Sequence, residues 1–207
     1  SRRSAADRFS RAVERELIEL AMGQSRFEVH FEPEVPGPGR WTGRGLDQAQ
    51  FFVSTNPGEE IRPLARIVSG GELSRMMLAL KTLASTDSHG KTLIFDEVDA
   101  GIGGHVADVV GQRLQHLGRE FQVLCITHLP QIAASGNVHY RVSKAVRQGR
   151  TVTTVEQLDV DARVDELARM MAGAVVTVGT RASAREMMTA RRGENEHEAK
   201  GERRKRK

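Results

Sequence analysis

Two adjacent carboxylates, Asp96 and Glu97, end a short apolar run and are the side chains best suited to catalysis. The run 93–95 (Leu-Ile-Phe) is continuous, as in a parallel strand buried on both faces. Open α/β sheets bind ligands at the carboxyl ends of such strands. Asp96 could therefore hold Mg²⁺, directly or through water, and Glu97 could orient and deprotonate an attacking water. Taken alone, the pair is equally compatible with a solvated strand end.

The sequence Ser69-Gly70-Gly71-Glu72 is a second candidate site, because it leads into a helical pattern. The apolar side chains of that pattern are Leu73, Met76, Met77, Leu80 and Leu83. A glycine-rich turn that opens a helix points free N–H groups and the positive end of the helix dipole outward, and phosphate is the usual anion there. The alternative is an N-cap and loop that bind no ligand.

His128 follows another apolar run, at 123–126, and could hydrogen-bond a γ-phosphate or the attacking water. A helical pattern at 105–118 joins this run to the first. Strand, helix and strand of these lengths predict a βαβ unit with parallel strands. Glu97 and His128 would then lie at the same edge of the sheet. A lone histidine at a strand end is more often structural.

The remaining segments predict a mixed α/β fold. Charged helical sequence fills 1–22, and the Pro- and Gly-rich segment 33–45 reads as a loop. The other expected elements are strands at 27–31 and 50–54, a short helix at 130–135, a hairpin at 140–146 and 151–158 joined at Gln148-Gly149, and helices from 161 to 173 and from 180 to 190.

Composition bounds the kind of protein. Of the 207 residues, 39% are hydrophobic but only 4% aromatic, so the core must be mainly aliphatic. The single cysteine, Cys125, lies in an apolar run, and we expect a buried free thiol in a cytoplasmic protein. No segment reaches the roughly 18 consecutive apolar residues that a membrane span requires.

The basic charge belongs to the carboxyl-terminal segment. Residues 191–207 hold eight Lys or Arg and four Glu, which equals the formal net charge of +4 of the whole chain. The rest of the chain is therefore neutral. We expect 191–207 to be a disordered tail. Its charge also allows a second hypothesis, a salt-sensitive electrostatic tether to DNA.

In this order the motifs resemble the carboxyl-terminal lobe of an ABC-type P-loop ATPase head. Residues 69–75 are similar to the signature motif, 92–97 to a Walker B strand with its catalytic glutamate, and 98–104 to the D-loop. His128 matches the switch histidine. Three segments resemble more closely the RecN family, SMC-like proteins of bacterial double-strand-break repair. They are 54–59 (Ser-Thr-Asn-Pro-Gly-Glu), 95–104 (Phe-Asp-Glu-Val-Asp-Ala-Gly-Ile-Gly-Gly) and 126–133 (Ile-Thr-His-Leu-Pro-Gln-Ile-Ala).

The resemblance implies a mechanism with ATP and Mg²⁺ as cofactors and DNA as a partner of a nucleoid-associated protein. Two heads would sandwich two ATP molecules, with Ser69, Gly70, Gly71 and Glu72 closing over the nucleotide held by the other copy. Asp99, in the D-loop, would couple the two sites. Residues 1–22 would be the end of a coiled-coil arm, and 23–190 the head portion.

A Walker A loop is missing from the sequence. Such a loop, Gly-x-x-x-x-Gly-Lys-Ser/Thr, cradles the β- and γ-phosphates, and no such string occurs here. In RecN-like proteins it lies near the amino terminus, before a long coiled coil. We therefore expect the chain to be a carboxyl-terminal fragment whose partner is the missing amino-terminal half.

Two other functions remain open. The first is an ABC transporter ATPase subunit, although transporters usually follow the Walker B glutamate with Pro-Thr-Ser and this chain has Val98-Asp99-Ala100. The second is a non-catalytic module that bridges DNA or acts as a scaffold when heads pair on ATP. The intact Asp96-Glu97 pair argues against the second alternative.

The missing loop leads to a first prediction. The isolated chain should neither bind ATP tightly nor turn it over, because its sequence contains no Walker A string to cradle the β- and γ-phosphates. Phosphate release is measured for the chain and for its Glu97→Gln variant. Hydrolysis by the chain that the substitution abolishes would contradict the prediction.

Overall fold

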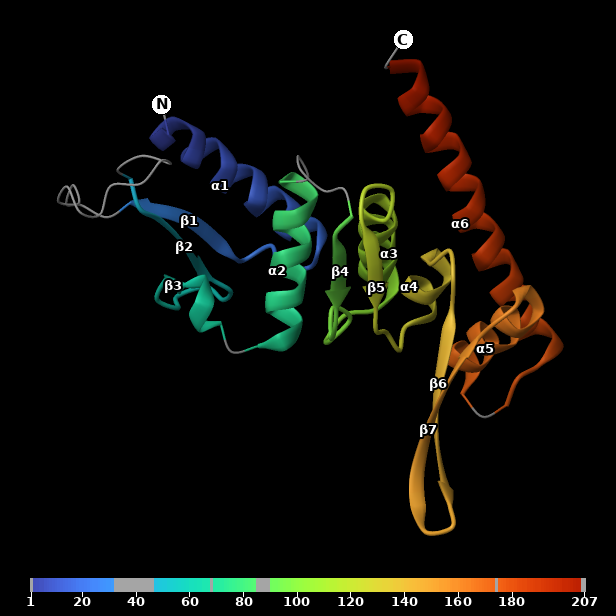
Figure 1. Ribbon diagram of the computed structural model, residues 1–207. Coiled ribbons are helices and arrows are strands. Elements are labelled where there is room, and N and C mark those ends of the chain that lie inside the picture. The colour runs from blue at the N-terminus through green and yellow to red at the C-terminus, as the bar shows by residue number, and fades with distance from the viewer. Residues whose placement is uncertain (1, 32–46, 68, 85–89, 174, 206–207) are drawn as a thin grey trace. The chain divides into compact units, whose positions relative to one another are not determined.

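The computed structural model describes residues 2–31, 47–67, 69–84, 90–173 and 175–205, with side chains up to Arg191. The loop expected at 33–45 lies outside the described residues. Along the chain the elements are α1 (Arg2–Glu19), β1 (Arg26–Phe31), β2 (Ala49–Ser54), β3 (Arg62–Pro63), a 3-10 turn η2 (Leu64–Arg66), α2 (Gly70–Leu83), β4 (Thr92–Phe95), α3 (Gly104–Leu117), β5 (Gln122–Cys125), α4 (Pro130–Ser135), β6 (Tyr140–Arg147), β7 (Arg150–Gln157), α5 (Val160–Ala172) and α6 (Val178–Lys205) (Figure 1).

These elements form two compact units. The first comprises residues 1–102 and 120–125, and the second comprises 103–119 and 126–207. The division falls inside the segment 23–190, which the sequence suggested as one head portion. The candidate acids and the signature loop belong to the first unit, and His128 belongs to the second.

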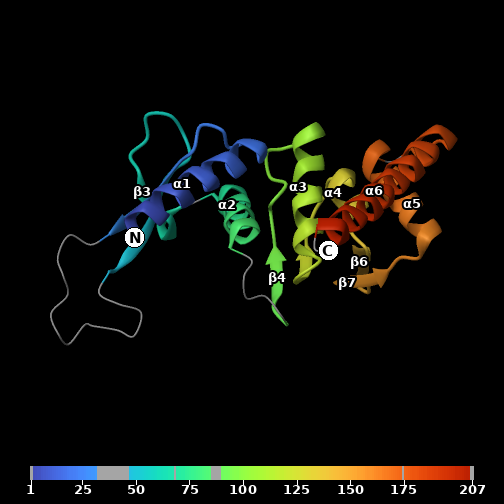
Figure 2. The ribbon, with the colours of Figure 1, turned by 90° about the horizontal axis from the view of Figure 1, so that it is seen from above.

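In the first unit, α1 packs on an antiparallel sheet with the order β1-β2-β3 and also contacts α2 (Figure 2). The amphipathic pattern of α1 places Val13 and Leu17 in the core, where both are fully buried. Phe27 of β1 and Val53 of β2 are register partners and are also buried. The predicted helix and the two predicted strands are therefore confirmed.

The strands β4 and β5, also in the first unit, pair in parallel, as the sequence predicts. Leu93 lies opposite Val123 and Phe95 opposite Cys125. Both carboxyl ends therefore meet at one edge of this pair, because parallel strands run in the same direction. The edge that carries the candidate acids is thus defined by backbone pairing.

The expectation that this strand is buried on both faces is wrong for the described chain. Phe95 is buried, but Ile94 is 68% exposed and its register partner Leu124 is 47% exposed. Side chains alternate between the two faces of a sheet, so one face of the β4–β5 pair is covered and the other is not. The apolar sequence is that of a strand whose exposed face packs against a further layer of structure.

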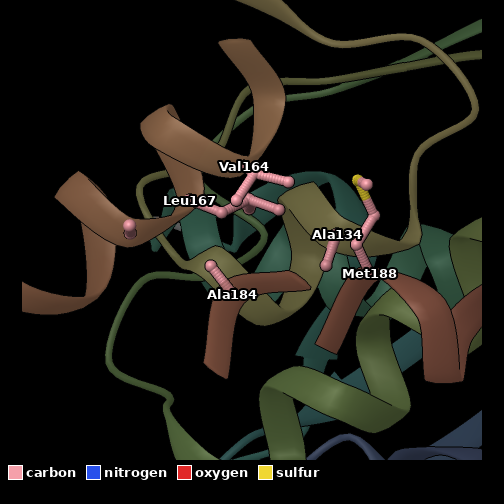
Figure 3. Packing of buried hydrophobic residues seen from close by; sticks show 6 residues of the cluster. Ala134, Val164, Leu167, Ala184 and Met188 are labelled. Atoms are coloured by element: carbon pink, nitrogen blue, oxygen red, sulfur yellow. The ribbon is translucent and has the colours of Figure 1, made fainter. Parts of the chain in front are cut away.

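The second unit is built around a small aliphatic core (Figure 3). Its buried members are Ala134, Val164, Leu167, Ala168, Ala184 and Met188, contributed by α4, α5 and α6. Asp159 caps α5 by accepting a hydrogen bond of 2.8 Å from the backbone N–H of Ala162. Ion pairs from Arg181 to Asp165 and from Arg185 to Asp161 tie α6 to α5 at its surface.

The predicted hairpin is confirmed. Strands β6 and β7 pair antiparallel over their full length, from Tyr140 opposite Gln157 to Arg147 opposite Arg150. Gln148 and Gly149, between the strands, both have positive φ, which is the backbone of the two-residue turn that matches the twist of a hairpin. All residues of both strands are exposed.

The tail predicted as disordered is helical as far as it is described. Helix α6 continues through 191–205, although the sequence suggested that it ends near 190. Glu, Ala, Lys and Arg dominate this segment and are strong helix formers, which the charge-based expectation overlooked. At the start of this segment, Arg191 makes an ion pair with Asp108 of α3.

The core of the second unit yields a stability prediction. Leu167→Ala should lower the free energy of unfolding by about 2–5 kcal/mol, since the side chain is fully buried and truncation leaves a cavity. Val178→Ala, at a position 88% exposed, should change it by less than about 0.5 kcal/mol. Urea unfolding followed by circular dichroism measures both. Equal losses would contradict the described core.

Candidate active site

The amino terminus of α2 has the geometry expected of a phosphate-binding turn. Ser69 is the N-cap, with extended backbone, and its Oγ accepts a hydrogen bond of 3.4 Å from the N–H of Glu72. Ser69 and Gly70 are exposed, whereas Gly71 is buried, so the exposed part of the turn is its first two residues. The capping prediction is confirmed, and the phosphate-binding role stays a prediction.

The acids Asp96 and Glu97 directly follow β4, and both are exposed. Glu97 has φ of 57°, a left-handed backbone that is uncommon for a residue with a side chain. This turn directs its carboxylate onto the start of α2, where Oε2 occupies the space that a β-carbon would take on Gly70. The two candidate sites, which lie far apart in sequence, are therefore neighbours in the first unit.

The first turns of α2 pack tightly against the loop after β4. A β-carbon on Gly71 would lie 2.7 Å from Cβ of Ala100 and 3.0 Å from the carbonyl oxygen of Glu97. Only glycine allows this approach. Ser74 Oγ donates a hydrogen bond of 2.5 Å to the carbonyl oxygen of Asp96. The acid-bearing loop is therefore fixed directly to the signature helix.

Arg75, one position further along α2, also contacts this loop. Its Nη1 donates hydrogen bonds to the carbonyl oxygens of Ala100, at 2.8 Å, and Val98, at 3.4 Å. The side chain is buried, and burial lowers the pKa of Arg75 below its usual value, while the carboxylate of Glu72 acts in the opposite direction. The guanidinium nevertheless remains charged near neutral pH.

Asp99 lies on the inner side of the same loop. It is only 4% exposed, and its carbonyl oxygen accepts a bond of 3.4 Å from the N–H of Ile102. The sequence suggested that Asp99 couples two sites across an interface between heads. In this chain the side chain is directed into the unit, so that role stays a prediction.

Cys125 ends β5 beside these acids. It is a free thiol and only partly buried, not fully buried as expected. Burial raises the pKa of Cys125 to about 12, and the negative charges of Asp99 and Asp96 contribute in the same direction. The thiol is therefore protonated near neutral pH and unsuited to nucleophilic chemistry.

His128 follows β5 in the loop before α4, and it is exposed. Thr127 Oγ1 accepts a bond of 3.0 Å from the N–H of Leu129, which fixes the turn around the histidine. His128 belongs to the second unit. Its predicted role beside Glu97 stays a prediction.

The sequence placed Ser74 and Arg75 in the signature-like motif 69–75 but did not predict their contacts with the loop after β4. The apolar spacing suggested a buried face with Leu73 and Met77, but Met77 is 36% exposed. The buried face of α2 instead contains Gly71, Arg75, Met76, Leu78, Ala79 and Leu80. The available signal was the spacing of Gly71 and Arg75, because residues four positions apart share a helix face and a tightly packed Gly71 places Arg75 on the buried side.

The described residues hold neither a metal-binding cluster nor a membrane-spanning helix. No cluster of three or more His, Cys, Asp or Glu side chains that could hold a metal occurs in that part of the chain. Nor is any helix within it both long and apolar enough to cross a membrane.

The fold is similar to part of a solved Smc head domain. The chain superposes on the Smc head domain of Pyrococcus yayanosii with a TM-score of 0.52 and 18% identity, covering 78% of this chain and 29% of that one. At this identity the match shows the fold alone. No family model matches the sequence.

The chain is also similar in sequence to a group of curated proteins. Proteins named DNA repair protein RecN share 41% identity over 187 residues in Halalkalibacterium halodurans, 42% over 191 in Xylella fastidiosa Temecula1 and 41% over 207 in Mycobacterium leprae. The matches cover 90%, 91% and 92% of this chain, but only 33%, 33% and 35% of those proteins. The chain is therefore similar to RecN proteins over about nine tenths of its own length, and it spans about a third of the length of these relatives.

The close approach at Gly71 yields a prediction. Gly71→Ala should lower the free energy of unfolding by about 1–3 kcal/mol, because the new methyl group meets Ala100 and the Glu97 carbonyl. Gly23→Ala is the matched control in the same unit, since its β-carbon would meet only Ile18, at 3.8 Å or more. Chemical unfolding and hydrogen exchange of 98–102 measure the effect. Equal stability of the two variants would contradict the packing.

Proposed function

We propose that this chain is the part of an SMC-like ATPase head that supplies the signature loop and the Walker B acids. The complete protein would bind and hydrolyse ATP and act in the repair of DNA double-strand breaks and in recombination. The contact of the Glu97 carboxylate with the start of α2 at Gly70 carries the proposal, since it joins both motifs in one unit. The DNA-repair name of the RecN relatives supports the biological role and favours it over a transporter subunit.

The donors present fit ATP and Mg²⁺. Ser69 and Gly70 offer an exposed helix amino terminus, which attracts a phosphate anion. Asp96 offers an exposed carboxylate at a strand end, the oxygen ligand that Mg²⁺ prefers. Bound MgATP supplies the phosphoryl group, and the reaction requires mainly positioning and charge neutralisation.

Each candidate residue then has a separate role. Asp96 supports the metal, and Glu97 orients water and accepts its proton. Gly71 and its neighbours in the first turn of α2 donate N–H groups to the γ-phosphate of nucleotide held by a second copy of the head. His128 hydrogen-bonds the γ-phosphate, and Asp99 couples the two nucleotide sites.

A further segment must complete the head. The exposed face of β4–β5, with Ile94 at 68% and Leu124 at 47%, is apolar, whereas parallel strands are normally covered on both sides. The chain also contains no Walker A string. We infer that the segment carrying the Walker A loop, in the two thirds of a RecN protein outside this chain, packs on this face.

DNA is the proposed partner of the complete protein. The described hairpin and the segment 191–205 both carry a surplus of Lys and Arg. Such surfaces bind the phosphate backbone without sequence preference and lose affinity as salt rises. Nucleotide-dependent pairing of two heads would then control whether the DNA is held or released.

The proposal predicts the behaviour of Glu97→Gln in the complete protein. Hydrolysis should fall by about 10²- to 10⁴-fold, because the amide cannot accept a proton from water. ATP should still bind, so paired heads should persist longer than in the wild type. Turnover and cross-linking of heads after an ATP chase measure this, with the exposed Glu60→Gln as control. Head pairing no longer-lived than in the wild type would refute the assignment.

A further inference from the structure

Arg75 is a buried cation that makes no ion pair with a carboxylate in the described part of the chain, although the nearby charge of Glu72 acts to raise its pKa. It is 7% exposed, and within the described part of the chain its side chain makes hydrogen bonds only to the carbonyl oxygens of Val98 and Ala100. Its Nε is buried and makes no hydrogen bond there. Burying a guanidinium without a carboxylate is unfavourable, and an apolar side chain of similar size would fill the space without that penalty. Packing alone therefore does not account for an arginine here.

The two carbonyl oxygens that Arg75 contacts indicate what this arginine does. The carbonyls of Val98 and Ala100 flank Asp99, and both follow Glu97 in the loop after β4. One guanidinium nitrogen bonded to both carbonyls fixes the 98–99 and 100–101 peptide groups, one before and one after Asp99. The strained backbone of Glu97, with φ of 57°, needs such external support to persist.

A second contact makes this link rigid. Arg75 lies one turn beyond Gly71 on α2, and Gly71 is already in close contact with Ala100 and the Glu97 carbonyl. A displacement of the signature turn must therefore displace the loop, because neither contact leaves room for sliding. The same helix thus carries the proposed phosphate-binding turn at one end and holds the proposed general base through its second turn.

We propose that Arg75 is a positioning residue that couples the signature turn to the Walker B and D-loop segment. Engagement of nucleotide by Ser69 to Gly71 is transmitted through Arg75 to the backbone at 98–100, which sets the orientation of Glu97. Arg75 touches neither nucleotide nor water in this role. The inference rests on the proposed ATPase function.

The test uses the complete protein with Arg75→Met and Arg75→Lys, and Lys81→Met as the control on the same helix. Binding of fluorescent ATP, kcat, KM and head pairing on a non-hydrolysable ATP analogue are measured. Arg75→Met should lower kcat by about tenfold or more, while the ATP dissociation constant and KM stay within about twofold. Arg75→Lys should restore part of kcat, because an ammonium can still donate to one of the two carbonyls.

The outcomes separate this inference from the proposed function. A wild-type protein without ATPase activity would overturn both. An active wild type that Glu97→Gln inactivates, with Arg75 variants that retain full kcat, would overturn only the role of Arg75. Parallel losses of ATP affinity, kcat and melting temperature would show a merely structural residue and also overturn it. If Arg75→Met does not fold, Arg75→Lys decides, and unchanged kcat in a folded lysine variant refutes the coupling.

Discussion

The close packing of the first turns of α2 on the loop after β4 is the constraint on which the site depends. Gly71 meets Ala100, Ser74 bonds the carbonyl of Asp96, and Arg75 bonds the carbonyls that flank Asp99. These contacts are short and mostly involve backbone, so they fix the loop more firmly than side-chain packing does. The acids and the signature turn therefore form one rigid piece.

This packing explains how a chain that spans about a third of its RecN relatives can hold the signature-like turn and the two acids in one local framework. The signature turn and the acids share one local framework, whereas a phosphate cradle must come from elsewhere. The apolar face at Ile94 and Leu124 is exposed in this chain, as expected of a sheet whose remaining cover lies in another segment.

The sequence predicted the elements well because their signals are local. Apolar periodicity, the Ser69 cap and the Gln148-Gly149 turn each depend on a few neighbouring residues, and the helix, cap and hairpin are present. The parallel pairing of β4 and β5 followed from connection length alone. The helix through 191–205 was missed because net charge was given more weight than helix propensity.

The contacts that define the site could not be predicted because they are not local. Nothing in the spacing indicated that Glu97 lies against Gly70, or that Asp99 is buried. The apolar spacing of α2 predicted a buried face that includes Met77 and leaves out Arg75, whereas Met77 is exposed and Arg75 is buried. Burial of an arginine against carbonyls depends on the path of a distant loop, which sequence periodicity does not encode.

The most direct test of this account is a structure of the complete protein with a non-hydrolysable ATP analogue. The account predicts that the N–H groups at Ser69 to Gly71 of one head contact the γ-phosphate of nucleotide bound by the other. Asp96 should lie beside the metal ion, and Glu97 beside the attacking water, at the nucleotide bound by their own head. Nucleotide bound away from both motifs, or contacted by the signature turn of its own head, would contradict it.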